Sequence, residues 1–240
     1  MKKVSVVIFI LFVFSSLCFA QEVTENYREL SFTTESVEEE IAKFILYTEQ
    51  HGKVQRFVSF IEQEVRMDTE FIYVTQRHFN SNGSVDKDSS IVTRNKLRPI
   101  YYFAKLKNGT FIEEYEFLDR RIEGRLGNPE NPENYIQEYK QESIYNAVVQ
   151  DLNLRSFPFK DRSLLSITIY NPGKSFMDVT YKVIGREILE FSSVKIDAIK
   201  VEMEGALLPT TIWISERKQE LLQQRTSLPN GSFFWKKKVL

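Results

Sequence analysis

Charges are nearly balanced in this chain of 240 residues, with 32 Lys or Arg against 33 Asp or Glu and a formal net charge of −1. Such a balance does not predict nucleic-acid binding, which is typically marked by a basic patch or stripe, so no nucleic-acid partner is expected. The hydrophobic content of 42%, which includes 19 Phe and 11 Tyr, is enough for a folded core and excludes a wholly disordered chain.

An export signal is predicted at the start of the chain. Lys2 and Lys3 give it a positive beginning, and Val4–Phe14 is apolar apart from Ser5, which is the length of a signal peptide's hydrophobic region. A membrane-spanning helix needs about 20 apolar residues, so a transmembrane anchor is the less favoured alternative.

Cleavage is expected after Ala20, where a small residue is followed by polar Gln21. The chain is thereby divided into a signal peptide, 1–20, and one domain, 21–240, which is expected to be periplasmic or secreted and to lack a membrane span. The single cysteine, Cys18, would leave with the signal. Disulfides and thiol catalysis are then excluded, so a packed core has to stabilise the domain.

The first predicted element of the domain is a helix over Val37–Gln50, ended by Gly52. Ser36 and Glu39 have the spacing of a capping box, and apolar residues then recur at helical spacing. The acidic run Glu38–Glu40 is interpreted as offsetting the dipole of the first helical turn rather than as a metal or acid site.

After Gly52 the apolar period changes to two, and β-branched and aromatic residues are enriched, which predicts strands. The first four are expected at Gln55–Arg66, Glu70–His78, Arg98–Lys107 and Thr110–Leu118. Asn108 and Gly109 suit a tight type I′ turn, so the last two strands should be antiparallel neighbours. The proline-containing stretch 128–134 is expected to be a loop that splits the meander in two.

The second half is predicted to begin with a short helix over Tyr145–Leu154. Its expected strands are Leu164–Tyr170, Phe176–Ile184, Glu187–Phe191, Val194–Met203, Thr210–Ser215, Glu220–Ser227 and Ser232–Leu240. Asn171–Lys174 has the composition of a turn, and a shift in apolar parity predicts a bulge near Asp197 and Ala198. The fold class is therefore mainly β: an antiparallel curved sheet forming an open or closed barrel of about ten strands, with one or two short helices.

From about Ser89 onward the order of motifs resembles the DUF3108 family of uncharacterised exported bacterial proteins. The residues that carry this resemblance are Asp88–Thr93, Leu97–Pro99, Leu154–Phe159, Thr180–Glu187, Ala198–Val201, Trp213–Ser215, Leu221 and Leu222. The resemblance implies an exported β-rich protein whose curved sheet is similar to the half-barrels that carry lipids or lipoproteins across a bacterial envelope. It implies no catalytic residue.

Aromatic residues on the predicted strands are the most informative functional feature. Such rings suit a pocket for an acyl chain or another apolar ligand, although they also suit an ordinary barrel core. The candidate ligand-binding residues are Tyr102, Phe111, Tyr115, Phe117, Tyr181 and Trp213, and Phe191, Phe233 and Trp235 lie on strands that should curve together with them. The first hypothesis is a non-catalytic envelope protein that binds a lipid, lipoprotein or other apolar ligand in the concave face of its sheet.

Two alternatives stay open. One is a protein interaction module of the cell envelope, with an apolar patch on its outer surface. The other is a glycan-acting hydrolase that uses a carboxylate pair from Glu113, Glu114 and Glu116. Alternation along a strand puts these acids on different faces, and Glu113, between Phe111 and Tyr115, is the one whose neighbours would desolvate it.

The remaining polar candidates favour structural roles. His51 and His78 are expected to face solvent rather than to act in catalysis. The sequence contains no zinc-protease, nucleophile-elbow or phosphate-loop motif, and no metal or cofactor is expected. Lys236–Lys238 are interpreted as protecting an edge strand, with contact to an anionic envelope lipid or glycan as the alternative.

Overall fold

The computed structural model describes residues 32, 34–141, 143–191 and 193–240, which belong to one unit, Ser31–Leu240. The predicted signal peptide, 1–20, and its cleavage site lie outside the described residues.

Within this described part, fifteen strands form a single sheet. They are β1 (Glu40–Gln50), β2 (Lys53–Met67), β3 (Phe71–Asn80), β4 (Val85–Thr93), β5 (Pro99–Leu106), β6 (Phe111–Leu118), β7 (Arg121–Asn128), β8 (Asn131–Glu138), β9 (Tyr145–Asn146), β10 (Leu164–Tyr170), β11 (Phe176–Phe191), β12 (Val194–Glu204), β13 (Thr210–Ser215), β14 (Leu221–Ser227) and β15 (Phe233–Val239). The helical elements are the α-helix α2 (Gln150–Ser156) and the 3₁₀ turns η1 (Thr34–Ser36), η2 (Lys107–Gly109) and η3 (Ala147–Val149).

The chain builds this sheet in two meanders that meet at its centre. The strand order is β8-β7-β6-β5-β4-β3-β2-β1-β15-β14-β13-β12-β11-β10-β9, so β1 and β15 are central neighbours and β8 and β9 are the edges. The described strand pairs are antiparallel except β9 with β10, which is parallel. The prediction that all strand pairs are antiparallel is therefore wrong for this one pair. The sheet is not closed, so the mainly β, open form of the predicted fold class is confirmed.

The strand number exceeds the predicted ten because several strands lack a strong apolar pattern. The buried residues of β4 include Asp88 and Ser90, and β7 contains Gly124 and Gly127, so neither strand was predicted. One difference lowers the strand number: two predicted strands form the single strand β11, whose register shifts at Ile184. The other predicted strands of both halves, and a short helix that overlaps Tyr145–Leu154, are confirmed to within a few residues.

The predicted helix over Val37–Gln50 is wrong, because most of this segment is strand β1. Its backbone pairs with β2 on one side and β15 on the other, and its buried residues Ala42 and Phe44 share the inner face of the sheet. These tertiary contacts outweigh the local capping signal. Glu39 does not cap a helix and instead accepts a hydrogen bond from the backbone N–H of Met67, at 2.9 Å.

The proline-containing stretch 128–134 is not the predicted long loop. Asn128 pairs with Asn131, so only two residues connect β7 to β8. Pro132 is tolerated because β8 is an edge strand, where a missing N–H need not interrupt the ladder. The meander is split as expected, but after β8.

The loop between β5 and β6 is longer than the predicted two-residue turn. The two strands are antiparallel neighbours, as predicted, and their terminal pair is Leu106 with Phe111. Asn108 and Gly109 have positive φ, as a type I′ turn would require, but so does Lys107. The connection is therefore a four-residue loop.

The predicted bulge near Asp197 and Ala198 is also wrong, because the register of β12 is continuous there. The apolar parity shifts because β12 is buried on both faces. Ala198 belongs to one hydrophobic cluster, whereas Ile199 and Val201 point to the opposite face.

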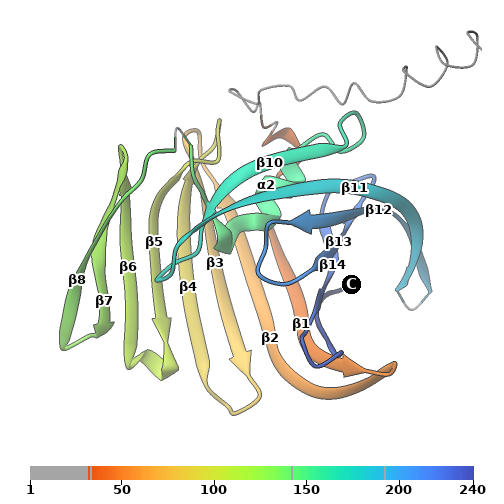
Figure 1. The fold of residues 1–240 in the computed structure, drawn as a ribbon, viewed down its shortest axis with the longest axis horizontal. Coiled ribbons are helices and arrows are strands. Elements are labelled where there is room, and N and C mark those ends of the chain that lie inside the picture. Colours follow the sequence, from red (N-terminus) through yellow and green to blue (C-terminus); the bar gives the residue numbers. More distant parts are fainter. Residues whose placement is uncertain (1–31, 33, 142, 192) are drawn as a thin grey trace, which may run out of the picture. The chain divides into compact units, whose positions relative to one another are not determined.

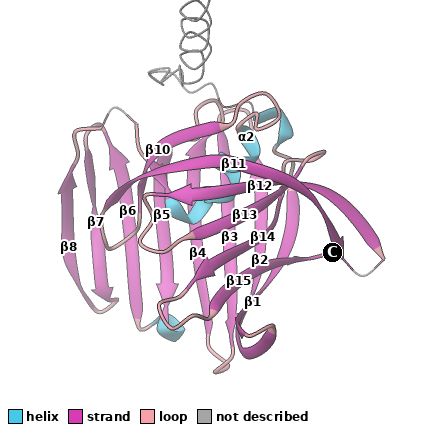
Figure 2. Ribbon diagram, turned by 45° about the vertical axis from the view of Figure 1, so that its right-hand side comes forward, coloured by secondary structure: helices cyan, strands magenta, loops and turns pink. Residues whose placement is uncertain are grey.

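The two meanders cover each other. Figures 1 and 2 show β10–β12 crossing over β3–β5, with α2 between the two sets of strands. Side chains join these layers, since Gln63 on β2 donates a hydrogen bond to Asp151 on α2 and Tyr170 on β10 packs edge-on against Tyr115 on β6. We call the side of the sheet that faces this space the inner face.

Candidate ligand-binding face

Three of the predicted ligand-binding residues lie together on the inner face. Tyr102 stacks on Tyr115 with ring centroids 6.0 Å apart, and the ring of Tyr170 lies edge-on to both Tyr115 and Phe117, at 5.9 and 5.7 Å. Tyr135 adds a further ring 4.9 Å from Tyr115. These rings pack against one another, and burial raises the pKa of Tyr102 and Tyr115 well above its usual value.

The other three predicted residues are not part of this cluster. Phe111 lies at the end of β6 under the ammonium of Lys107, which is 4.9 Å from the ring centroid. Tyr181 is fully buried on the inner face of β11, opposite Met203. Trp213 lies on the opposite face of the sheet, because its register partner is Lys200 rather than inward-facing Val201. The six residues therefore do not line one pocket.

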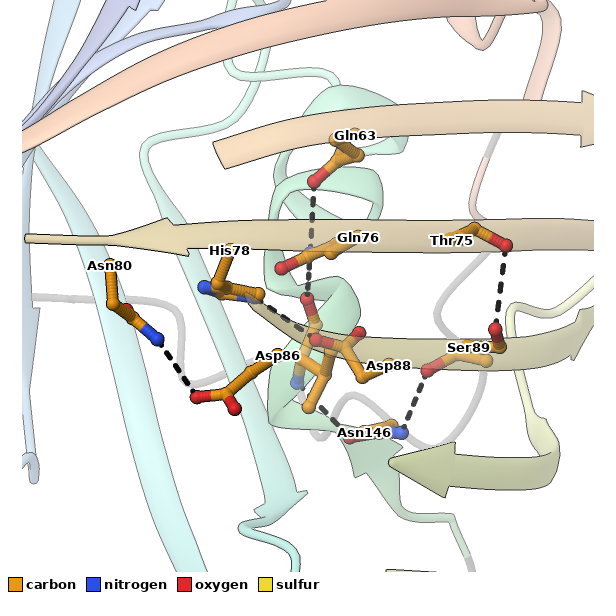
Figure 3. Close-up of polar contacts among 11 residues, drawn as sticks. Gln63, Thr75, Gln76, His78, Asn80, Asp86, Asp88, Ser89 and Asn146 are labelled. Carbon is orange, nitrogen blue, oxygen red and sulfur yellow. Dashed lines mark hydrogen bonds and ion pairs between the residues drawn. The ribbon is translucent and has the colours of Figure 1, made fainter. Parts of the chain in front are cut away.

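The rest of the inner face contains a polar cluster, shown in Figure 3. Gln63 donates to Asp151 at 2.6 Å, and Gln76 donates to Gln63 and to the carbonyl of Val148. Asn146 donates to the Ser90 hydroxyl at 3.3 Å. These bonds fasten η3, α2 and β9 to strands β2–β4, which is a structural role.

His78 and Asp88 form a second part of the cluster, 3.0 Å apart. The expectation that His78 faces solvent is wrong, since it is half-buried on β3. His51 is exposed at the turn after β1, as expected.

The three lysines of β15 do not protect an edge, because β15 is a central strand. Lys236 points inward with its Nζ 4.5 Å from the centre of the Phe44 ring, and burial of the amine lowers its pKa, partly offset by Asp151 and Asp88. Lys238 forms ion pairs with Glu40 and Glu220.

Glu40 also pairs with Arg155 of α2, and this ion pair attaches α2 to β1. Glu40 was predicted to lie in the first turn of a helix, but it is the first residue of β1. A pocket of about 300 Å³ next to this network is lined mainly by charged residues, among them Glu38 and Arg217. Its charged lining is unlike that of a site for an apolar ligand.

The glutamates of β6 point to different faces, as predicted. Glu114 accepts a hydrogen bond from Tyr101 at 2.7 Å, which is the main reason that its pKa is lowered. Glu113 is half-buried, and desolvation raises its pKa against the opposing effect of Lys174. The desolvation expected of Glu113 is thus confirmed, but no second carboxylate of this strand faces it.

Aromatic residues also gather on the opposite side of the C-terminal meander, on a surface that we call the tryptophan face. Its rings come from β1, β11, β13 and β15 and are those of Tyr47, Phe191, Trp213, Phe233 and Trp235. Trp213 and Trp235 stack with ring centroids 6.0 Å apart, and Tyr47 also stacks on Trp235, with centroids 6.3 Å apart. Trp213 is buried, whereas Tyr47, Phe233 and Trp235 are half-buried.

The tryptophan face also carries cations. The guanidinium of Arg225 lies over the rings of Phe233, Trp213 and Trp235. Lys200 lies 5.3 Å from the Trp213 ring and pairs with Glu187, whose carboxylate also accepts the indole N–H of Trp213.

The face is curled and elongated. Phe191, at the tip of the β11–β12 hairpin, packs in one cluster with Trp213, and both this hairpin and β1–β2 bend at their far ends (Figure 1). From Phe233 to Val239 the face follows β15 for roughly 20 Å. Near its end lies a pocket of about 670 Å³ whose lining is mostly charged and includes the apolar residues Val194, Ile196 and Leu240. Ile196 also packs against the Trp213 cluster.

Four of the five rings on this face, those of Phe191, Trp213, Phe233 and Trp235, were among the aromatic residues expected to lie on strands that curve together, whereas Tyr47 and Arg225 were not predicted. Tyr47 was missed because its segment was predicted to be a helix. Arg225 was missed because a single arginine within an alternating strand gives no sequence signal of its own. The alternation of Phe233, Trp235 and Lys237 along one strand was a usable signal for a shared face.

Among the described residues, no group of three or more His, Cys, Asp or Glu is arranged to hold a metal ion. The helices in that part of the chain are too short or too polar to cross a membrane.

These features define a single-sheet β protein with a packed inner face and a curled, aromatic and cationic outer one. The chain belongs to the family described as Protein of unknown function (DUF3108), whose sequence profile matches residues 53–236. The match confirms the resemblance and extends it toward the amino terminus from Ser89. No curated protein sequence matches the chain significantly.

Proposed function

We propose that the protein is a non-catalytic, exported binding protein whose ligand is an elongated apolar molecule, such as an acyl chain, bound on the tryptophan face. The observation that carries the proposal is the stack of Tyr47, Trp235 and Trp213 on a curled surface, with two of the three rings half-exposed. Flat rings that keep part of their surface in water gain free energy when an apolar chain covers them.

The tryptophan face is favoured over the tyrosine cluster of the inner face because of how the rings pack. Tyr102, Tyr115 and Tyr170 are already covered by one another and by neighbouring side chains. A ligand there would have to displace well-packed side chains, which is costly. Export is supported by the predicted signal peptide and by the expectation for the family.

The experiment uses the two tryptophans as reporters, because Trp213 and Trp235 are the only ones in the sequence. The chain without residues 1–20 is titrated with dodecanol below its solubility limit, and tryptophan emission is recorded. We expect a saturable blue shift as water leaves the indoles. Native mass spectrometry of protein purified from a periplasmic extract should also detect a co-purifying acyl species.

Two matched variants assign the signal to this face. Tyr47→Ala removes a half-buried ring from the tryptophan face and should weaken binding about tenfold, which is typical of losing one well-placed ring at a binding site. Tyr73→Ala removes an exposed ring from β3 and should leave binding unchanged. Absence of any saturable shift, or an equal loss in both variants, would refute the proposal.

A further inference from the structure

The strongest unexplained feature of the tryptophan face is the environment of Arg225. Its guanidinium carbon lies 4.8 Å from the Phe233 ring centroid and 5.8 Å from those of Trp213 and Trp235. Ring faces attract a cation and hold its plane in place, but they do not neutralise its charge. The side chain is therefore positioned by apolar groups and keeps its charge.

Lys200, another cation of this face, has an acidic partner in Glu187. Arg225 forms no ion pair with any residue in the described ranges, and its Nε is buried without a hydrogen-bond acceptor. A buried donor without a partner is costly, so a group that supplies an acceptor here is favoured.

The nearest acids by register do not fill this role. Glu202 shares the face of Thr211, which is the register partner of Arg225, and Glu49 is the partner of Phe233. Neither lies within ion-pair distance of Arg225 among the described contacts. The indole Nε1 of Trp235 is a second buried donor beside Arg225 that has no acceptor.

Lys237 is a second cation of the tryptophan face that has no acidic partner among the described residues. It follows Trp235 by two residues on β15, so it lies about 7 Å further along the same face. Its Nζ is 5.2 Å from the Phe191 ring centroid. Charge complementarity therefore favours an anion on a face whose remaining surface is aromatic.

From this arrangement we infer that the ligand is an anionic amphiphile. Its carboxylate or phosphate oxygens accept hydrogen bonds from Arg225 and the Trp235 indole, while its acyl chain covers the rings toward Ile196. The guanidinium fork matches such head groups in a bidentate geometry. The inference rests on the proposed function, since it specifies which apolar-chain ligands that same face selects.

The test compares two probes of equal chain length, dodecanoate and uncharged dodecanol, by tryptophan fluorescence at low salt. We expect the wild-type protein to bind dodecanoate about tenfold or more tightly than dodecanol, and this preference to shrink as salt is raised. Arg225→Gln should abolish the preference while changing the affinity for dodecanol less than about twofold. Arg56→Gln, at an exposed arginine of β2, is the matched control and should retain it.

The outcomes separate this inference from the proposed function. Equal, salt-independent binding of both probes by the wild-type protein would overturn the anionic head group and leave the apolar site intact. Binding of neither probe would remove the proposed function itself. The salt series needs only the wild-type protein, so it decides the inference even if Arg225→Gln fails to fold.

Discussion

The ammonium of Lys237 on β15 lies 5.2 Å from the centre of the Phe191 ring on β11, although β12, β13 and β14 separate these two strands in the sheet. Adjacent strands are about 4.8 Å apart, so a flat sheet would hold the two residues roughly 19 Å apart. The contact therefore requires that the C-terminal meander is curved, with the tryptophan face on its concave side. It also makes Phe191 the residue that fastens the hairpin tip.

Replacing Phe191 with Ala should release the tip of the β11–β12 hairpin. The ring is almost fully buried against Trp213 and its neighbours, so its loss should lower the free energy of unfolding by about 3 kcal/mol. Amide hydrogen exchange at Leu189 and Ile196 should accelerate. Val194→Ala, at an exposed position of the same hairpin, should change stability by less than about 0.5 kcal/mol, and equal effects of the two substitutions would contradict this assignment.

Gly124→Ala should be among the most destabilising single substitutions in the sheet. A Cβ at this position would overlap the backbone carbonyl oxygen of Glu114, and a backbone atom cannot move aside as a side chain can. Tyr115 and Tyr135 are its register partners on either side, and their rings meet across it. We expect a loss of about 3 kcal/mol or more in urea unfolding.

Gly185→Ala is the matched control for that substitution. Gly185 also lies in a strand, but a Cβ there would meet nothing within 4 Å, and its φ is not positive. Its replacement should be neutral within about 0.5 kcal/mol or slightly stabilising. A neutral Gly124→Ala would show that β6 and β7 can separate without cost.

The sequence predicted the C-terminal meander well because its strands alternate and its turns are marked. Thr210–Ser215 was predicted with its observed bounds, and Asn171–Lys174 forms the expected turn with Gly173 at positive φ. Local pattern was sufficient there because the strands are short and their neighbours follow directly in the chain.

The same reasoning failed where distant contacts decide the structure. β1 has helix-like spacing and a capping box, and its pairing with β2 and with β15, some 190 residues later, makes it a strand. The tryptophan face was equally hidden, since Tyr47 reaches Trp235 through the pairing of β1 with β15, and Phe191 joins this group only through the curl of the sheet. Twist and coiling depend on many strands at once and leave no signal in a short window.

Gln63→Leu should destabilise the attachment of α2 to the sheet. Gln63 is fully buried and donates to Asp151, so its replacement leaves a buried carboxylate oxygen without that donor and removes one of the two acceptors of Gln76. The expected cost is about 2–3 kcal/mol, since the acceptor is charged. Gln55→Leu, the same change at the exposed end of β2, should cost less than about 0.5 kcal/mol. Similar unfolding midpoints for the two variants would show that the polar cluster is dispensable.

Glu113 should make stability depend on pH. Desolvation raises the pKa of its carboxyl above the ordinary 4.5, so the folded protein holds this proton more tightly than the unfolded chain does. The resulting stabilisation is fully present below about pH 4.5 and is lost as pH rises through the folded-state pKa. Glu113→Gln should therefore be more stable than the wild-type protein at pH 7.5 and nearly equal to it at pH 4.

Two further variants make this pH effect specific. Lys174 lowers the pKa of Glu113, so Lys174→Gln should raise that pKa further and enlarge the loss of stability between pH 4 and pH 7.5. Glu116→Gln changes an exposed glutamate of the same strand that points to the other face, and it should leave the pH dependence as it is in the wild-type protein. Urea unfolding at the two pH values measures all three variants. If Glu113→Gln and Glu116→Gln gave the same difference, the half-buried position of Glu113 would not be its source.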